Sequence, residues 1–291
     1  SIPEYIGITT KPYVNIGRMR NSGWDSSLQY DQKIGQVNFS AMGNFTFARN
    51  VIEDQDQPDY IEKYMNRTGQ ARWQTFGYVS DGLFKDEADI ATSPDQSALG
   101  EVRPGDIKYK DLNNDGVIDS KDVKAIGYTD VPEIVYGFGV SAQWKGFDVS
   151  VFFQGNAHVS FSINSSMVRG FTEPKMAANN VFSDIYGNYW TESNTDAKYP
   201  RLTTTEATNN NQSSDFWLVN GRYIRLKNAE FGYTFPKRLI QKMRLSQLRV
   251  FVSGTNLLTF APFKLWDPDL QTGASNYPNT RVANIGLNIG F

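Results

Sequence analysis

The end of this 291-residue chain alternates with the period of a β-strand. From Ala283 to Phe291 every odd position is apolar and every even position is Asn or Gly. Successive side chains of a strand point to opposite faces, so one face of this segment is apolar and the other is small or polar. The apolar face needs an apolar neighbour. That neighbour is either the second sheet of a soluble sandwich or the acyl chains around an outer-membrane barrel.

A second alternating segment predicts a hairpin. Every even position from Ile134 to Trp144 is apolar, and the odd positions from Phe147 to Phe153 continue the pattern after Lys145-Gly146. A two-residue turn at Lys145-Gly146 pairs Trp144 with Phe147. The two aromatic side chains then lie at the strand ends on the apolar face, where an interfacial aromatic girdle would place them.

Further strands are expected at 23–31, 37–47, 229–235 and 248–252, with a weaker one around 70–84, which gives roughly eight to ten strands in all. Before Ala229, the apolar residues Ile224 and Leu226 follow the opposite phase. We expect a β-bulge there, or a change from a membrane strand to an extramembrane strand.

The connections alternate between short and long. The turns at 31–35 and 145–146 are short, and 236–245 is a compact basic link with one amphipathic helical turn, whereas 154–221 and 259–280 are long and polar. Outer-membrane barrels distribute periplasmic turns and extracellular loops in this way. A soluble sandwich has less reason to do so.

Composition excludes several classes of protein. Mean hydropathy is −0.47, and the chain has no run of about 18 apolar residues that would form a transmembrane helix. With 29 basic and 31 acidic residues, the chain gives no electrostatic reason to bind nucleic acid. The absence of cysteine excludes disulfides, thiol catalysis and Cys-ligated metals.

Residues 111–122 have the spacing of an EF-hand-type calcium loop, with Gly116 at the sharp turn and Ile118 as the apolar anchor. An Asx-rich turn without metal is the alternative. No long helices flank the loop, which favours a structural ion over a regulatory switch. The expected ligands are the side chains of Asp111, Asn113, Asp115 and Asp119, the carbonyl of Val117, and Asp122 in place of the usual Glu.

No catalytic constellation is evident, because the one histidine, His158, has no recognisable triad partners. We therefore predict that the chain is not an enzyme. Aromatic residues in the long polar loops are candidates for stacking on a sugar, although packing within the loops is the alternative. These candidates are Tyr189, Trp190, Trp217 and Trp266.

Five segments taken together match a known family. They are 104–119 (PGDIKYKDLNNDGVID), 132–139 (PEIVYGFG), 197–202 (AKYPRL), 223–228 (YIRLKN) and 256–260 (NLLTF). Over nearly its whole length the chain resembles the C-terminal third of SusC/RagA-like TonB-dependent outer-membrane transporters. The resemblance implies an all-β fold, the C-terminal part of a 22-stranded barrel with a plug in its lumen.

The resemblance also implies the organisation and the partners. Residues 1–291 would be barrel wall with a calcium loop inserted at 104–123, and Phe291 would belong to the barrel-assembly signal. The expected partners are the N-terminal plug and barrel portion of the same transporter, TonB, a SusD-like lipoprotein and outer-membrane lipid. Without the missing strands an open sheet edge would leave backbone groups unsatisfied in lipid, so the fragment alone should not be competent.

The sequence therefore predicts TonB-dependent import of a glycan across the outer membrane of a Gram-negative cell, together with a SusD-like lipoprotein. One alternative is a transporter of the same type that imports oligopeptides. The other is a soluble, secreted, calcium-bearing β-sandwich that binds carbohydrate. Dependence on detergent distinguishes the barrel from the sandwich, because only the sandwich buries its apolar face within the protein.

Overall fold

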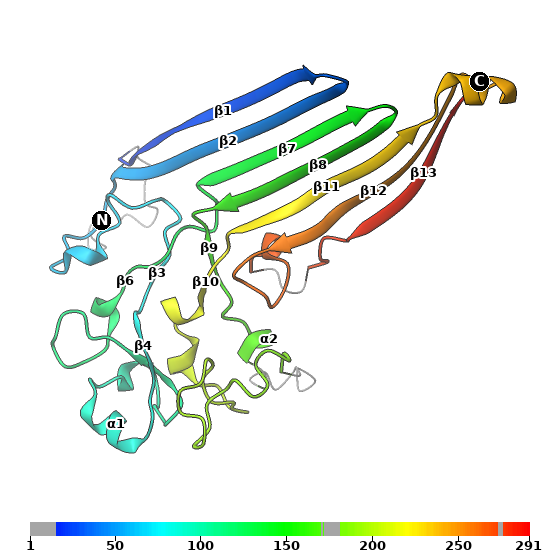
Figure 1. Ribbon diagram of the computed structural model, residues 1–291. Helices are drawn as coiled ribbons and strands as arrows, with labels where there is room; N and C mark the ends of the chain where they lie inside the picture. The colour runs from blue at the N-terminus through cyan, green and yellow to red at the C-terminus, as the bar shows by residue number, and fades with distance from the viewer. Residues whose placement is uncertain (1–15, 170, 172–180, 273–275) are drawn as a thin grey trace, which may run out of the picture. The chain divides into compact units, whose positions relative to one another are not determined.

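The computed structural model describes residues 16–169, 171, 181–272 and 276–291, and most of its elements are strands (Figure 1). Among the described residues, no helix has the length and apolar character needed to cross a membrane. The strands are β1 (Arg18–Ile34), β2 (Val37–Asp54), β3 (Phe76–Gly77), β4 (Ser80–Leu83), β5 (Ile107–Tyr109), β6 (Lys124–Ala125), β7 (Ile134–Trp144), β8 (Phe147–Ala157), β9 (Ser160–Ser162), β10 (Leu218–Asn220), β11 (Tyr223–Thr234), β12 (Gln247–Phe260) and β13 (Val282–Gly290). The α-helices are α1 (Glu87–Thr92), α2 (Ser166–Arg169) and α3 (Lys237–Ile240).

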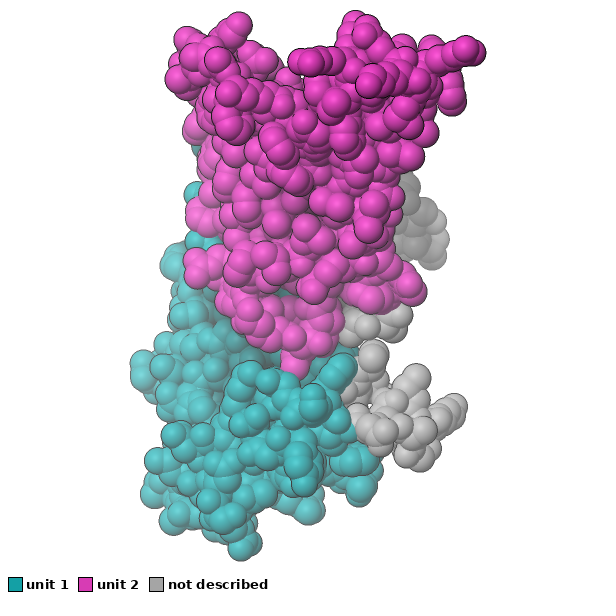
Figure 2. Space-filling model, turned by 45° about the vertical axis from the view of Figure 1, so that its right-hand side comes forward, with its two compact units in different colours: residues 1–22, 49–129, 161–219 teal, residues 23–48, 130–160, 220–291 magenta. Residues whose placement is uncertain are grey.

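The chain forms two compact units, drawn in teal and magenta in Figure 2. Unit 1 comprises residues 1–22, 49–129 and 161–219, and unit 2 comprises residues 23–48, 130–160 and 220–291. Unit 1 is built mainly from the long connections between sheet strands. Unit 2 contains β7, β8, β11, β12 and β13 together with the adjoining parts of β1 and β2.

Seven strands form one sheet in the order β1-β2-β7-β8-β11-β12-β13 (Figure 1). The expected hairpin is present, because Trp144 pairs with Phe147. The turn residues Lys145 and Gly146 have φ values of 47° and 88°. Positive φ at both positions matches the right-handed twist of the flanking strands. This turn therefore fixes the register of β7 against β8.

The register lines up apolar residues across six neighbouring strands. One row consists of Val37, Trp144, Phe147, Tyr233, Val250 and Leu287. This face is open to its surroundings: Val140 is 45% exposed, Phe147 43% and Ile285 84%. A contiguous apolar surface of this kind marks an interaction with another protein or with lipid. The predicted apolar face of the terminal strand is thus part of a sheet-wide band.

A β-bulge in β11 explains the change of phase seen in the sequence. Leu226 lies opposite Phe153 and Asn228 lies opposite Phe152, so Lys227 is the additional residue. The extra residue brings Leu226 onto the same face as Ala229, which would otherwise lie opposite it. The predicted bulge is confirmed.

The sequence suggested roughly eight to ten strands in all; among the described residues, seven strands form the large sheet and six short ones lie outside it. The segment around 70–84, expected as a weak strand, contains only the short strands β3 and β4. These pair with β6 and β5 within unit 1 instead of joining the large sheet.

The core of unit 1 is organised around a buried carboxylate. Asp106 is 0% exposed, and its Oδ1 lies 2.8 Å from Nε of Arg201. Asn210 donates its side-chain N–H to Asp106 Oδ1 at 2.8 Å and accepts the backbone N–H of Ile107 at 2.8 Å. A buried polar network of this kind specifies one arrangement only while every member keeps its partner.

We expect Asp106→Asn to destabilise unit 1 by about 3 kcal/mol, because it leaves the guanidinium of Arg201 without its counterion. The control is Asp81→Asn, which breaks the half-exposed pair of Asp81 with Lys110 and should cost at most about 1 kcal/mol. Proteolysis of the folded receptor over a urea series measures both changes. Equal losses in the two variants would contradict a special role for Asp106.

Candidate functional site

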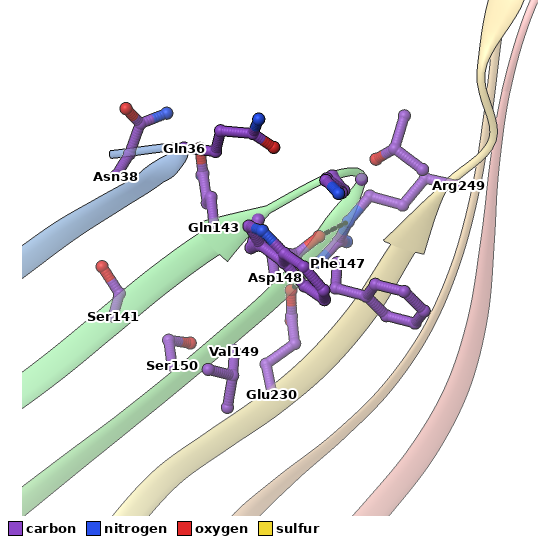
Figure 3. A pocket seen from close by; sticks show the side chains of 14 residues that line it. Gln36, Asn38, Ser141, Gln143, Phe147, Asp148, Val149, Ser150, Glu230 and Arg249 are labelled. Atoms are coloured by element: carbon purple, nitrogen blue, oxygen red, sulfur yellow. Dashed lines mark hydrogen bonds and ion pairs between the residues drawn. The ribbon is translucent and has the colours of Figure 1, made fainter. Parts of the chain in front are cut away.

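The face of the sheet opposite the apolar band is polar. It is formed by the alternate positions of the same strands, and it is hollowed near the β7–β8 turn (Figure 3). Six of the fourteen residues that line the hollow carry amides or hydroxyls, which suit hydrogen bonding to a neutral polar ligand or to water. These side chains include Gln36, Asn38, Ser141, Gln143 and Ser150.

One ion cluster lies in this hollow. Arg249 of β12 donates from Nε to Asp148 Oδ1 at 3.1 Å and from Nη2 to Asp148 Oδ2, and Nη2 also bonds Glu230 Oε1 at 2.6 Å (Figure 3). A planar guanidinium matches such a forked contact with a carboxylate. Since two carboxylates face one cation, the cluster carries a formal charge of about −1 at neutral pH.

Gly232 makes room for this contact. A Cβ atom at Gly232 would lie 2.4 Å from Nη2 of Arg249, so no larger residue fits without moving the guanidinium. In the register, Gly232 lies opposite Asp148, and Arg249 lies opposite Thr234 on the other side of β11. The glycine therefore lets Arg249 pass across β11 to reach β8.

A second arginine holds the last long loop against the sheet. Arg225 of β11 is 1% exposed, and its Nη2 and Nη1 lie 2.5 Å from Asp267 and 2.7 Å from Asp269. Its Nε donates to Thr259 Oγ1 at 3.0 Å. The sequence analysis missed this site, although Arg225 is in the family-like YIRLKN segment and Asp267-Pro268-Asp269 presents two carboxylates to one side. The arginine and the two carboxylates position the loop that carries Trp266.

Residues 111–122 form a compact loop whose acidic side chains bond its own backbone. Asp111 accepts the N–H of Asn114 at 2.6 Å and that of Gly116 at 2.8 Å, and Asp115 accepts the N–H of Val117 at 3.0 Å. Gly116 has a φ of 86°, as expected for the sharp turn, and the anchor Ile118 is 0% exposed. Gly116 thus lies at a sharp turn, and Ile118 is packed inside the protein.

The candidate calcium ligands of this loop bond its backbone instead of forming a metal cluster. In the part of the chain that the structure describes, no group of three or more His, Asp or Glu side chains is arranged to hold a metal ion. Asp122 is buried, and its two oxygens accept the N–H groups of Leu112 and Asp119 at 2.7 and 2.9 Å. Asp119 accepts the N–H of Lys121 at 2.7 Å.

The side-chain ammonium group of Lys121 lies beside two carboxylates of this loop. Nζ of Lys121 is 3.4 Å from Asp115 and 3.6 Å from Asp119. Hydrogen bonds from the Asn113 side chain, from the Val117 amide and from Lys121 hold the pKa of Asp115 below its usual value. The donor set of oxygens suits calcium, but in this conformation a lysine supplies the counter-charge.

The candidate aromatic residues have different environments. Tyr189 and Trp190 lie in unit 1, where the backbone N–H of Trp190 donates to the carbonyl of Tyr199 at 2.9 Å and the ring of Trp190 packs over Gly105. Trp266 lies in unit 2, half-buried, with its ring edge-to-face with Phe263 and its N–H bonded to the Gln271 carbonyl at 2.7 Å.

Trp217 is a core residue. It is 1% exposed, and its ring N–H donates to the carbonyl of Asn210 at 2.7 Å. Its ring is therefore not available to stack on a ligand, and the packing alternative holds for this position. The four aromatic candidates are divided between the two units.

The terminal residue lies beside the sheet. Phe291 is 94% exposed and directly follows β13, whose last residue, Gly290, pairs with Gln247. An exposed aromatic at this position is compatible with the predicted assembly signal, which stays a prediction.

Comparison with known proteins identifies relatives over the whole chain. No family profile matches it. TonB-dependent receptor P3 of Formosa agariphila is 28% identical over 320 residues, covering 100% of this chain and 30% of the receptor. TonB-dependent receptor P26 of the same organism is 26% identical over 324 residues, covering 100% of this chain and 31% of the receptor. The chain thus spans about a third of the length of the curated relatives it matches.

Solved structures give the same result for the fold. The structure of the RagAB peptide transporter matches with a TM-score of 0.69 at 23% identity, covering 100% of this chain and 31% of that one. The RagAB peptide importer in its "open-open" state matches with a TM-score of 0.70 at 22% identity, with 100% and 30% covered.

The fold and its two faces define a segment of the wall of an outer-membrane β-barrel. The chain is related to the TonB-dependent receptors and corresponds to a C-terminal portion of one. The predicted resemblance, fold class and outer-membrane location are therefore confirmed, and the soluble sandwich is not favoured. Since the relatives are receptors and transporters, they fit the prediction that the chain is not an enzyme.

We expect Arg225→Gln to release the loop at 261–272, because two carboxylates would face each other without a cation, at a cost of roughly 3–5 kcal/mol. Hydrogen exchange of the receptor should show faster exchange throughout this segment. The exposed neighbour Arg222, changed to Gln, is the matched control and should leave exchange unchanged. Equal exchange in both variants would show that Arg225 does not hold the loop.

Proposed function

We propose that this chain forms part of the barrel wall of an importer that carries oligosaccharides across the outer membrane. The observation that supports a role in transport most strongly is the two-faced sheet. Six neighbouring strands present an apolar row to one side and polar side chains to the other. Such a wall separates lipid from an aqueous lumen.

The polar face favours a neutral, hydroxyl-rich substrate over a charged one. Amides and hydroxyls are the largest group in its lining, six of fourteen residues, and three of its four charged side chains pair with one another. Sugars are recognised by hydrogen bonds to such groups and by stacking on aromatic rings, for which Tyr189, Trp190 and Trp266 are the candidates. For this reason we propose glycans, in preference to peptides, as the transported substrate.

The other parts of the machinery follow from the kind of receptor. An N-terminal portion of the same receptor would supply the plug and the remaining strands, TonB would energise transport through that portion, and a SusD-like surface lipoprotein would help to capture substrate. Import of oligopeptides is the second candidate. It is supported by the likeness to the RagAB peptide transporter, although at 23% identity that likeness concerns the fold alone.

Adjacent residues on opposite faces of β7 test the transport role. Ser141→Trp places a bulky ring on the polar face and should slow uptake several-fold, whereas Val140→Trp places the same ring in the apolar band and should not. Uptake of labelled oligosaccharides by cells that carry each full-length receptor measures the difference. The same cells given labelled oligopeptides distinguish the two substrates. Equal uptake by both variants would contradict a lumen on the Ser141 side.

We also propose that the loop at 111–122 binds calcium as a structural ion. The spacing of its oxygen ligands, the turn at Gly116 and the buried Ile118 support this proposal. For the ion to bind, Lys121 has to give up its position beside Asp115 and Asp119.

Two substitutions test the calcium proposal in opposite directions. Asp115→Ala removes a ligand and should lower the calcium bound by the purified receptor, whereas Lys121→Gln removes the competing ammonium and should raise calcium affinity. Isothermal titration with calcium measures both. If neither substitution changes calcium binding, the loop is an Asx-rich turn whose charge is balanced by Lys121.

A further inference from the structure

The link between β11 and β12 carries four cations and no acidic residue. From Phe235 to Leu248 the sequence contains no Asp or Glu. The link forms α3 and the 3₁₀ turn η8 (Gln241–Met243), so it is a compact, ordered element. Its four cations are all exposed, and none of them forms an ion pair among the described residues; they are Lys237, Arg238, Lys242 and Arg244.

The same link exposes two apolar side chains. Leu239 is 59% exposed and Met243 is 63% exposed. Residues four apart lie on one side of a helical turn, so these two side chains form a small apolar tip among the cations. Ile240, by contrast, is 2% exposed and anchors the link to the sheet. An element with an apolar tip and surrounding cations is suited to a lipid–water interface.

The link lies at one end of the apolar band. Tyr233, which ends the row on β11, is 4.5 Å from Phe147 and 5.0 Å from Phe235 between ring centroids. Aromatic residues of this kind mark the level at which a barrel meets the headgroups. Another cation is at the same end, because Nζ of Lys145 lies 5.1 Å from the ring of Trp144.

The nearby acidic residues do not neutralise the link. Asp148 and Glu230 point to the polar face, where both bind Arg249. The positive charge of the link therefore remains available to groups outside the protein. Unpaired cations at a membrane surface attract anionic lipid.

The connections decide which leaflet the link meets. The register places the turns after β1, β7 and β11 at one end of the sheet, and the long connections leave from the other end. In outer-membrane barrels the short turns are periplasmic. The link therefore faces the periplasmic leaflet.

We propose that residues 236–245 form a binding site for anionic phospholipid headgroups of the periplasmic leaflet. The ammonium and guanidinium groups bond the phosphates, and Leu239 and Met243 enter the acyl region beneath them. The site anchors this end of the receptor wall at the level of the lipid headgroups. It is independent of the transported substrate.

The test compares lipid binding by the full receptor in detergent. One variant combines Lys237→Gln, Arg238→Gln, Lys242→Gln and Arg244→Gln, and the control combines Lys237→Arg, Arg238→Lys, Lys242→Arg and Arg244→Lys. Native mass spectrometry counts the phosphatidylglycerol and phosphatidylcholine molecules retained, with matched acyl chains. The wild type and the control should prefer phosphatidylglycerol about tenfold, and the glutamine variant should lose this preference.

Each other outcome overturns the proposal. A glutamine variant that keeps the preference places the lipid elsewhere on the receptor. Loss of the preference in the charge-preserving control shows that charge is not what binds. A wild type without any preference favours an acidic protein segment as the partner of the link. Heat-dependent electrophoretic mobility checks that each variant has folded.

A second measurement does not depend on removing charge. This chain has no cysteine, so Leu239→Cys introduces a labelling site into it. A fluorophore at this position in the reconstituted receptor should be quenched by phosphatidylglycerol with brominated acyl chains. The matched control, Gln241→Cys, lies on the other side of the turn and should be quenched less. Equal quenching at the two positions would contradict insertion of the Leu239 tip.

Discussion

The exposed apolar face of the sheet is the constraint on which the rest of this structure depends. Val140, Phe147 and Ile285 face outward in register, and apolar surface costs about 25 cal/mol per Å² when it is left in water. Lipid acyl chains would cover this face and remove the cost without a second protein sheet. In lipid, however, the free edges of β1 and β13 would leave backbone groups unpaired. The sheet therefore requires further strands, in agreement with relatives about three times as long as this chain.

On the polar side of the sheet, charged side chains are compensated by one another. Arg249 and Arg225 each bind two carboxylates, and each brings together groups from different segments of the chain. Breaking the cluster of the buried Arg225 would leave an uncompensated charge, so that cluster fixes the position of the loop more than it adds net stability. Gly232 belongs to this arrangement because it leaves the space through which Arg249 reaches Asp148.

Much of the fold was predictable from the sequence because alternation is local. The hairpin at Lys145-Gly146, the faces of β13 and the bulge at Lys227 all follow from residues close together in the chain. The pairs of Arg225 with Asp267 and Asp269 bridge 42 and 44 residues, and periodicity contains no information about such partners. For the same reason the sequence left two alternatives open for Trp217, stacking on a ligand and packing within the loop, because a polar, Asn-rich segment gives no sign of a core. The spacing at 111–122 predicted the turn of the loop but not the lysine beside its carboxylates.

The long connections fold around a core of their own, and this affects how a receptor of this kind can recognise a substrate. Asp106 and Asn210 are buried and fully bonded, so the backbone around them is held in one arrangement. The half-buried ring of Trp190 packs over Gly105, one residue before Asp106 in the chain. An aromatic side chain supported in this way would lose little conformational freedom on binding a ligand. Under the proposed function, specificity in these loops would depend on preorganised side chains on an ordered base, and substitutions in the buried network would alter it without contacting the ligand.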